Sequence, residues 1–197
     1  RACPTAASSA VPGPAGGDTK PVIGDTSYTN GKTSIKISKR ETGHGDSKVT
    51  SYLADIMMAD ATALRSAFSK GKYGKLILEV PSDTAKSVGA VLAFNGDFYG
   101  FRDNGIIIRN GTIYRDEGVR PGLAMYRNGT MAVYDETSTS ADKLLADGVW
   151  NTLSFGPELV RDGKVLSDIG TFEIGDVLRN GQKTSIQGRH PRTGIGM

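Results

Sequence analysis

The side chains best suited to chemistry in this sequence lie together in the short stretch Asn95-Gly96-Asp97, directly after the apolar run Leu92-Ala93-Phe94. Asn-Gly is a strong turn signal because both residues tolerate a positive φ. Such a turn would present an amide, a carboxylate and bare backbone at the end of a buried strand. The alternative is a plain turn in which Asn95 and Asp97 cap the backbone while Phe98 and Tyr99 enter the core. The stretch alone leaves both interpretations open.

Two further blocks follow later in the chain: Phe155-Gly156-Pro157-Glu158-Leu159-Val160-Arg161-Asp162-Gly163 and His190-Pro191-Arg192-Thr193-Gly194-Ile195-Gly196. In this order, with Ala54-Asp55-Ile56 near the start, the blocks resemble the phosphodiester glycosidase family. That family includes bacterial proteins labelled as exopolysaccharide biosynthesis proteins. It also includes the lysosomal enzyme that removes N-acetylglucosamine from a phosphodiester. The resemblance runs from Tyr28 to Met197.

The family pattern continues past the last block with an Asp-Gly segment and an Asp-Gly-Gly-Gly-Ser loop, whereas this sequence ends at Met197. We expect that part of the site to come from a following segment or from a second chain. Two functions remain open at this point. One is a glycosidase, inactive as this fragment alone, and the other is a non-catalytic glycan-binding or structural surface module on the same fold.

The resemblance implies a sugar 1-phosphodiester as substrate, cleaved at the anomeric carbon so that the phosphate stays on the aglycone. Arg192 is then expected to hold the phosphate, because a guanidinium fork matches phosphate oxygens. His190 could donate to the phosphate or move a proton. Asp97 is expected to face the substrate and to stabilise the oxocarbenium-like centre or activate water. Without the resemblance, Arg192 would be a surface arginine or the partner of a core carboxylate.

The resemblance also implies the substrate-binding residues. Asn95 is expected to bind a sugar hydroxyl or acetamido group through its amide. Gly96, Gly156 and Thr193 complete the expected set, with Gly156 shaping backbone near the pocket. Asp162, although it lies in the second block, is expected to be a turn residue of a hairpin.

We expect no resident cofactor and no metal centre built on histidines, since the two histidines are His44 and His190. His44 stands in a loop and is expected to be solvated. A divalent ion held by Asp and Asn oxygens stays open, although the spacing is not that of an EF-hand. The sequence lacks a Walker-type phosphate loop, zinc-ligand spacing and an esterase serine elbow.

Composition excludes several classes of protein. The 24 basic and 21 acidic residues are interspersed, and a formal charge of +3 without a basic block argues against a nucleic-acid binder. The sequence has no apolar run of the roughly 20 residues that a membrane span needs. The resemblance, and not the composition, implies a sugar phosphate or glycan as the partner and an extracellular or cell-surface location.

The 26 glycines and the repeated Asn-Gly pairs are typical of short strands joined by tight turns. The expected fold is α+β, with a mixed, largely antiparallel sheet of short strands and hairpins and two or three short helices. Strands are expected at 33–39, 48–56 and 90–94, and hairpins at 106–114, 123–134 and 159–166. Helices are expected at 60–71, 82–88 and 142–147. Residues 76–80 could be a strand or irregular, and 171–189 a surface loop with a short strand.

Domain organisation follows from composition. Residues 1–27 are rich in Ala, Pro, Gly, Ser and Thr and have few large apolar side chains. Such a segment cannot bury enough surface to offset its ordering entropy, so we expect a flexible tail or linker. Residues 28–197 are expected to form the phosphodiester glycosidase-like domain.

Overall fold

The computed structural model describes residues 19–154, 156–167, 169, 173–177, 183–185 and 188–197. The chain divides into two compact units, an N-terminal unit Arg1–Asp60 and a C-terminal unit Ala61–Met197. Each unit has its own antiparallel sheets.

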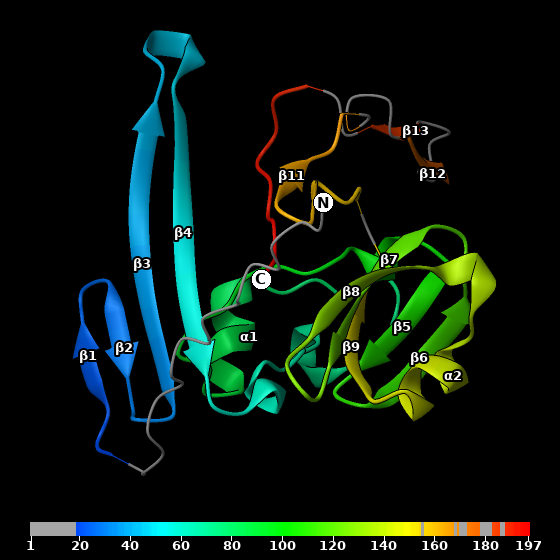
Figure 1. Ribbon diagram of the computed structural model, residues 1–197, viewed down its shortest axis with the longest axis horizontal. Coiled ribbons are helices and arrows are strands. Elements are labelled where there is room, and N and C mark those ends of the chain that lie inside the picture. Colours follow the sequence, from blue (N-terminus) through cyan, green and yellow to red (C-terminus); the bar gives the residue numbers. More distant parts are fainter. Residues whose placement is uncertain (1–18, 155, 168, 170–172, 178–182, 186–187) are drawn as a thin grey trace, which may run out of the picture. The chain divides into compact units, whose positions relative to one another are not determined.

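The N-terminal unit is a four-stranded antiparallel meander in the order β1-β2-β3-β4 (blue to cyan in Figure 1). Its strands are β1 Val22–Gly24, β2 Ser27–Thr29, β3 Thr33–Thr42 and β4 Val49–Met58. Strands are expected at 33–39 and 48–56, and β3 and β4 form there and pair over all ten residues of each. Ile35 lies between Tyr28 and Ile56 in the register and is buried.

The sequence predicts a tail over residues 1–27, but β1 and the start of β2 fall within this range. Val22 pairs with Thr29 and Ile23 with Tyr28, so the sheet begins before the expected boundary. Strand pairing needs only backbone partners, and Val22 and Ile23 join the sheet although their exposed fractions are 66% and 78%. Residues 1–18 lie outside the described part of the chain.

The C-terminal unit holds two small sheets side by side, the hairpin β5-β6 and the three-stranded β8-β7-β9, together with two further hairpins (green to orange in Figure 1). The strands of the first two sheets are β5 Gly105–Arg109, β6 Thr112–Glu117, β7 Pro121–Tyr126, β8 Met131–Asp135 and β9 Val149–Leu153. The further hairpins are β10 Val160–Arg161 with β11 Lys164–Val165, and β12 Glu173–Val177 with β13 Lys183–Ser185.

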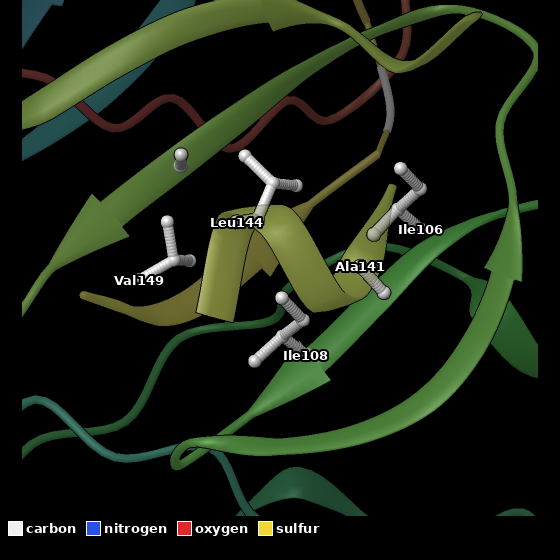
Figure 2. Packing of buried hydrophobic residues seen from close by; sticks show 6 residues of the cluster. Ile106, Ile108, Ala141, Leu144 and Val149 are labelled. Atoms are coloured by element: carbon white, nitrogen blue, oxygen red, sulfur yellow. The ribbon is translucent and has the colours of Figure 1, made fainter. Parts of the chain in front are cut away.

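The hydrophobic core lies between these strands and helix α2 (Figure 2). Its buried members are Ile106, Ile108, Ala124, Ala141, Leu144 and Val149. β5 is buried on both faces, because Ile107 is also fully buried, which explains its unbroken apolar run. The Thr152 hydroxyl joins β5 to β9: it accepts from the Ile108 amide (2.9 Å) and donates to the Ile106 carbonyl (2.8 Å).

All three expected hairpins form. Their turns lie at Asn110-Gly111, Asn128-Gly129 and Asp162-Gly163, as the sequence indicates. Asn110 (φ 51) and Gly111 (φ 73) both adopt left-handed backbone, and so do Asp162 (φ 50) and Gly163 (φ 73). These are the angles that favour Asn, Asp and Gly in a two-residue turn.

Helical content is lower than expected. The described residues contain two α-helices, α1 Pro81–Ser87 and α2 Ala141–Ala146, close to two of the predicted helices. The helix expected at 60–71 is absent: two 3-10 turns, η2 Ala61–Ala63 and η3 Ser69–Gly71, flank irregular backbone there. The remaining 3-10 turns are η1 Gly45–Ser47, η4 Tyr99–Phe101 and η5 Glu136–Ser138. The fold is therefore β-rich and mostly antiparallel.

The prediction of a strand at residues 90–94 is also wrong. This apolar run has no ladder partner among the described strands, and Val91 and Phe94 remain 61% and 43% exposed. Residues 76–80 are irregular, which was one of the two alternatives. Residues 173–177 and 183–185 form two short strands within the segment expected to be a surface loop with one short strand. None of the helices in the described part is long and apolar enough to cross a membrane.

Candidate functional site

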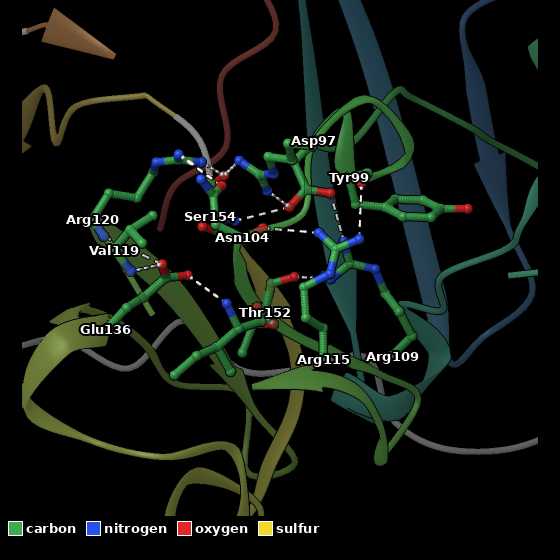
Figure 3. Close-up of polar contacts among 12 residues, drawn as sticks. Asp97, Tyr99, Asn104, Arg109, Arg115, Val119, Arg120, Glu136, Thr152 and Ser154 are labelled. Atoms are coloured by element: carbon green, nitrogen blue, oxygen red, sulfur yellow. Dashed lines mark hydrogen bonds and ion pairs between the residues drawn. The ribbon is translucent and has the colours of Figure 1, made fainter. Parts of the chain in front are cut away.

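Asp97 is the centre of a buried polar cluster in the C-terminal unit (Figure 3). Its side chain is 1% exposed, and both carboxylate oxygens accept hydrogen bonds. Oδ1 accepts from Arg109 Nη2 at 2.5 Å. Oδ2 accepts from Arg102 Nη2 at 3.0 Å and from the Ser154 amide at 2.9 Å. Two guanidiniums and an amide thereby offset the cost of burying this carboxylate.

The same two arginines also donate hydrogen bonds to backbone carbonyls in β9 and just beyond its end. Arg102 donates to the carbonyl of Ser154, just beyond the end of β9, and Arg109 donates to the carbonyl of Thr152 in β9. Each guanidinium also lies over an aromatic ring, Arg102 at 5.3 Å from the centroid of Phe98 and Arg109 at 5.9 Å from that of Tyr99. These contacts hold both guanidiniums in fixed orientations.

Two more arginines extend this cluster. Arg120, which is buried, donates to the side chain of Asn104 (3.0 Å) and to the carbonyl of Ser154 (3.5 Å). Arg115, which is half-buried, donates to the carbonyls of Asn104 (2.8 Å) and Tyr99 (3.2 Å). We call Arg102, Arg109, Arg115 and Arg120 the arginine cluster.

Glu136 is a second buried carboxylate beside the cluster and is held in a different way. Its oxygens accept from the backbone amides of Ile106 (2.9 Å), Val119 (3.2 Å) and Arg120 (3.4 Å). The carboxylate, which follows the end of β8, is thereby hydrogen-bonded to both β5 and the β6–β7 connection. Burial raises the pKa of the nearby Tyr134 hydroxyl, and the charge of Glu136 raises it further.

Four aromatic rings form a cluster beside Arg109. Phe68 packs edge-on against Tyr73, Tyr99 and Tyr114, and Tyr73 stacks on Tyr99 with ring centroids 5.2 Å apart. Burial is also the main reason why the pKa of the Tyr99 hydroxyl is raised. The rings attach the irregular segment after η2 to β6 and to the turn η4.

Thr193 of the third sequence block and Ser154, the residue just before the second block, both contact the loop Asn95-Gly96-Asp97 of the first block. Thr193 in the third block donates its hydroxyl to Asn95 Oδ1 at 3.2 Å, and both residues are exposed. Ser154, which binds Asp97, immediately precedes the second block. Gly156 has φ +82, a backbone conformation that suits glycine. Phe155 lies outside the described residues.

The other expected residues lie at the surface. Arg192 and His190 are exposed on the segment that carries Thr193. His44 is exposed and forms a turn, in which its carbonyl accepts from the hydroxyl (2.6 Å) and amide (3.0 Å) of Ser47. Asp162 is an exposed turn residue of the β10–β11 hairpin, as expected.

Asp97 is where the geometry differs from the expectation. We expect a carboxylate that faces the substrate, but the structure turns this side chain inward to three donors. The exposed groups where the first and third blocks meet are instead the Asn95 amide, the Thr193 hydroxyl and the backbone of Gly96, which suit hydrogen bonding to a sugar or phosphate. Within the described residues, no group of three His, Cys, Asp or Glu side chains could hold a metal ion.

Sequence reasoning missed the arginine cluster, Glu136 and Ser154. One signal was available, since Arg109 directly ends the apolar run Ile106-Ile107-Ile108 and Arg102 follows Phe101. An arginine that continues a buried run requires a buried acceptor. Asp97 is such an acceptor, but its sequence position alone does not identify the partners.

Comparisons with known proteins place the three blocks within the range of one family match. The family model described as "Phosphodiester glycosidase" matches residues 88–197, a range that contains all three blocks and the arginine cluster. One curated relative is the "SPbeta prophage-derived uncharacterized protein YomE" of Bacillus subtilis (strain 168), which is 29% identical over 136 residues. That match covers 63% of this chain and 19% of the relative, so the chain spans only a minor part of that protein.

A comparison with the solved structures gives no significant match. The family match therefore stands on sequence, and it extends over more than half of the chain, from the end of α1 to Met197. Through these residues the chain belongs to the phosphodiester glycosidase family.

Proposed function

We propose that this chain carries the substrate-binding surface of a hydrolase that cleaves a sugar 1-phosphodiester at its anomeric carbon. The observation that carries the proposal is the hydrogen bond between Thr193 and Asn95. It joins residues 98 positions apart and brings two family blocks together where both side chains are exposed. The family match over both blocks supports the reaction class.

The chemistry that follows is hydrolysis with a good leaving group. Water attacks the anomeric carbon, the bond from that carbon to the phosphate oxygen breaks, and the phosphate leaves on the aglycone. The group that leaves is the phosphate monoester of the aglycone, a weakly basic anion, so the main requirement is a cation and donors to hold it. Arg192 supplies the guanidinium and His190 a further donor, while Asn95 and Thr193 bind the sugar.

We further propose that the substrate belongs to an extracellular or cell-surface glycan. The exposed position of Asn95, Thr193 and Arg192 allows a large substrate to approach. The partner on this proposal is a glycan or sugar phosphate.

The test measures release of free sugar from a UDP-sugar or another sugar phosphodiester by the full-length protein. Arg192→Ala should lower the rate by roughly ten- to a hundredfold, because each charge-assisted hydrogen bond contributes about 1.5–3 kcal/mol. Arg192→Lys should recover part of the rate, since lysine keeps the charge and loses the fork. Arg65→Ala, an exposed arginine of the same unit, is the matched control and should leave the rate unchanged.

Circular dichroism confirms that each variant is folded. Equal rates in wild type and both Arg192 variants would remove Arg192 from the mechanism. If the full-length protein binds glycans but releases sugar from none of these diesters, the chain is a non-catalytic binding module.

A further inference from the structure

Asp97 lies next to the proposed binding surface but does not open onto it. Its side chain is 1% exposed, and its oxygens are occupied by Arg102, Arg109 and the Ser154 amide at 2.5–3.0 Å. A water molecule or an anomeric carbon would have to displace one of these donors to reach the carboxylate. Displacement would leave a guanidinium buried without its counter-charge, which is strongly unfavourable.

The three donors come from three different parts of the C-terminal unit. Arg102 follows the turn η4, Arg109 ends β5, and Ser154 follows β9. The carboxylate therefore ties its own loop to two strands of the core. The same loop also meets β9 through its backbone, because a Cβ built on Gly96 would lie 3.3 Å from Leu153 Cδ2. The loop is held on the side that faces the core.

Asn95 lies two residues before Asp97, and its exposed side chain accepts from Thr193 at 3.2 Å. At one end of the loop, Asp97 is buried and held by its ion pairs. At the other end, Asn95 is exposed and contacts Thr193 of the third block. We propose that Asp97 is a positioning residue. Its ion pairs with Arg102 and Arg109 hold the Asn95-Gly96 turn against the core, so that Asn95 and Thr193 stay together. What this surface binds rests on the proposed function.

If Asp97 only positions the loop, a substitution of Asp97 alters the kinetic constants by displacing Asn95. Asp97→Asn removes the charge with little change in shape. It should raise KM for a sugar phosphodiester about tenfold, the effect of losing roughly one hydrogen bond to substrate, and lower kcat less. The acid limb of the pH profile of kcat should remain, because Asp97 does not exchange protons with substrate.

A double-variant cycle separates positioning from direct contact. Asn95→Ala should raise KM by a similar factor. The combination Asn95→Ala/Asp97→Asn should raise KM no more than the larger of the two single changes does, since both changes remove the same contact between Asn95 and the substrate. Asp162→Asn makes the same chemical change at an exposed turn that already has left-handed backbone, and it should leave both constants unchanged. If Asp97→Asn does not fold, Arg109→Lys loosens the same ion pair while retaining the charge.

Hydrogen–deuterium exchange gives a readout that needs no activity. In Asp97→Asn, peptides covering Asn95 and Gly96 should exchange faster, whereas Ile106–Ile108 in β5 should remain protected. Unchanged exchange at Asn95 and Gly96, loss of the acid limb, or additive effects in the double variant would each overturn the proposal. If the wild type cleaves no sugar phosphodiester, the proposed function fails, and the exchange experiment still decides whether Asp97 holds the loop.

Discussion

At the scale of single residues, the C-terminal unit stabilises two buried carboxylates in two different ways. Asp97 pairs with guanidiniums, whereas Glu136 accepts from three backbone amides and is 1% exposed. Each arrangement offsets the cost of removing a carboxylate from water. Loss of either carboxylate leaves buried donors without an acceptor.

We predict that Glu136→Gln lowers the free energy of unfolding by about 2–3 kcal/mol. The amide nitrogen of glutamine would face backbone N–H groups that need an acceptor, and an unsatisfied buried donor costs about 1–3 kcal/mol. Urea denaturation of the folded variant measures the change. Glu117→Gln makes the same substitution at an exposed position in β6 and should stay within about 0.5 kcal/mol of wild type. Equal stability of the two variants would contradict a structural role for Glu136.

At the scale of elements, tight turns determine the register of the hairpins. The β5–β6 and β10–β11 turns have nearly the same backbone angles, but their surroundings differ. A Cβ on Gly111 would overlap the Arg127 guanidinium and lie 3.1 Å from Trp150, whereas a Cβ on Gly163 would meet nothing within 4 Å. The two glycines share a φ of +73 and therefore form a matched pair.

We predict that Gly163→Ala lowers the free energy of unfolding by about 1 kcal/mol, because an L-residue in left-handed backbone is strained. Gly111→Ala should cost about 1–3 kcal/mol more, because Arg127 must move away from Trp150, over which it lies at 4.3 Å. Chemical denaturation measures both changes, and Trp150 fluorescence reports the displacement. If Gly111→Ala is no more costly than Gly163→Ala, the close approach to Arg127 does not matter for stability.

At the scale of the whole molecule, the two units differ greatly in their cores. The C-terminal unit contains the six-residue hydrophobic cluster, whereas Ile35 is the buried hydrophobic side chain found in the described part of the N-terminal unit. Fully burying one such side chain contributes about 1.5–3 kcal/mol, and ordering each residue costs about 1–2 kcal/mol. The C-terminal unit therefore has the core that an independent domain needs, and the N-terminal unit does not.

We predict that residues 61–197 fold without the N-terminal unit, while residues 19–60 alone show no cooperative unfolding. Hydrogen exchange should find the slowest amides of the 61–197 fragment at Ile106–Ile108, as in the full chain, because these side chains are fully buried. Thermal unfolding followed by circular dichroism tests the 19–60 fragment. Loss of protection at Ile106–Ile108 in the larger fragment would show that its core depends on the N-terminal unit.

The sequence by itself predicted the parts of this protein that depend on neighbouring residues. Polar–apolar alternation over residues 33–39 predicted β3, and the pairs Asn110-Gly111, Asn128-Gly129 and Asp162-Gly163 predicted their turns. These features follow from side-chain period and backbone angle, which act over a few residues. The ordered blocks indicated the family for the same reason, because a block is a local pattern of residue types.

Tertiary structure alone decided which groups are buried and with what partners. Asp97 could face a ligand or the core, and its three donors lie 5, 12 and 57 residues away. The apolar runs at 90–94 and in β5 are both expected to be strands, yet only β5 pairs with another strand within the described part of the chain. A side chain's environment depends on what the rest of the chain places against it, so a buried ion pair or a strand needs a distant partner.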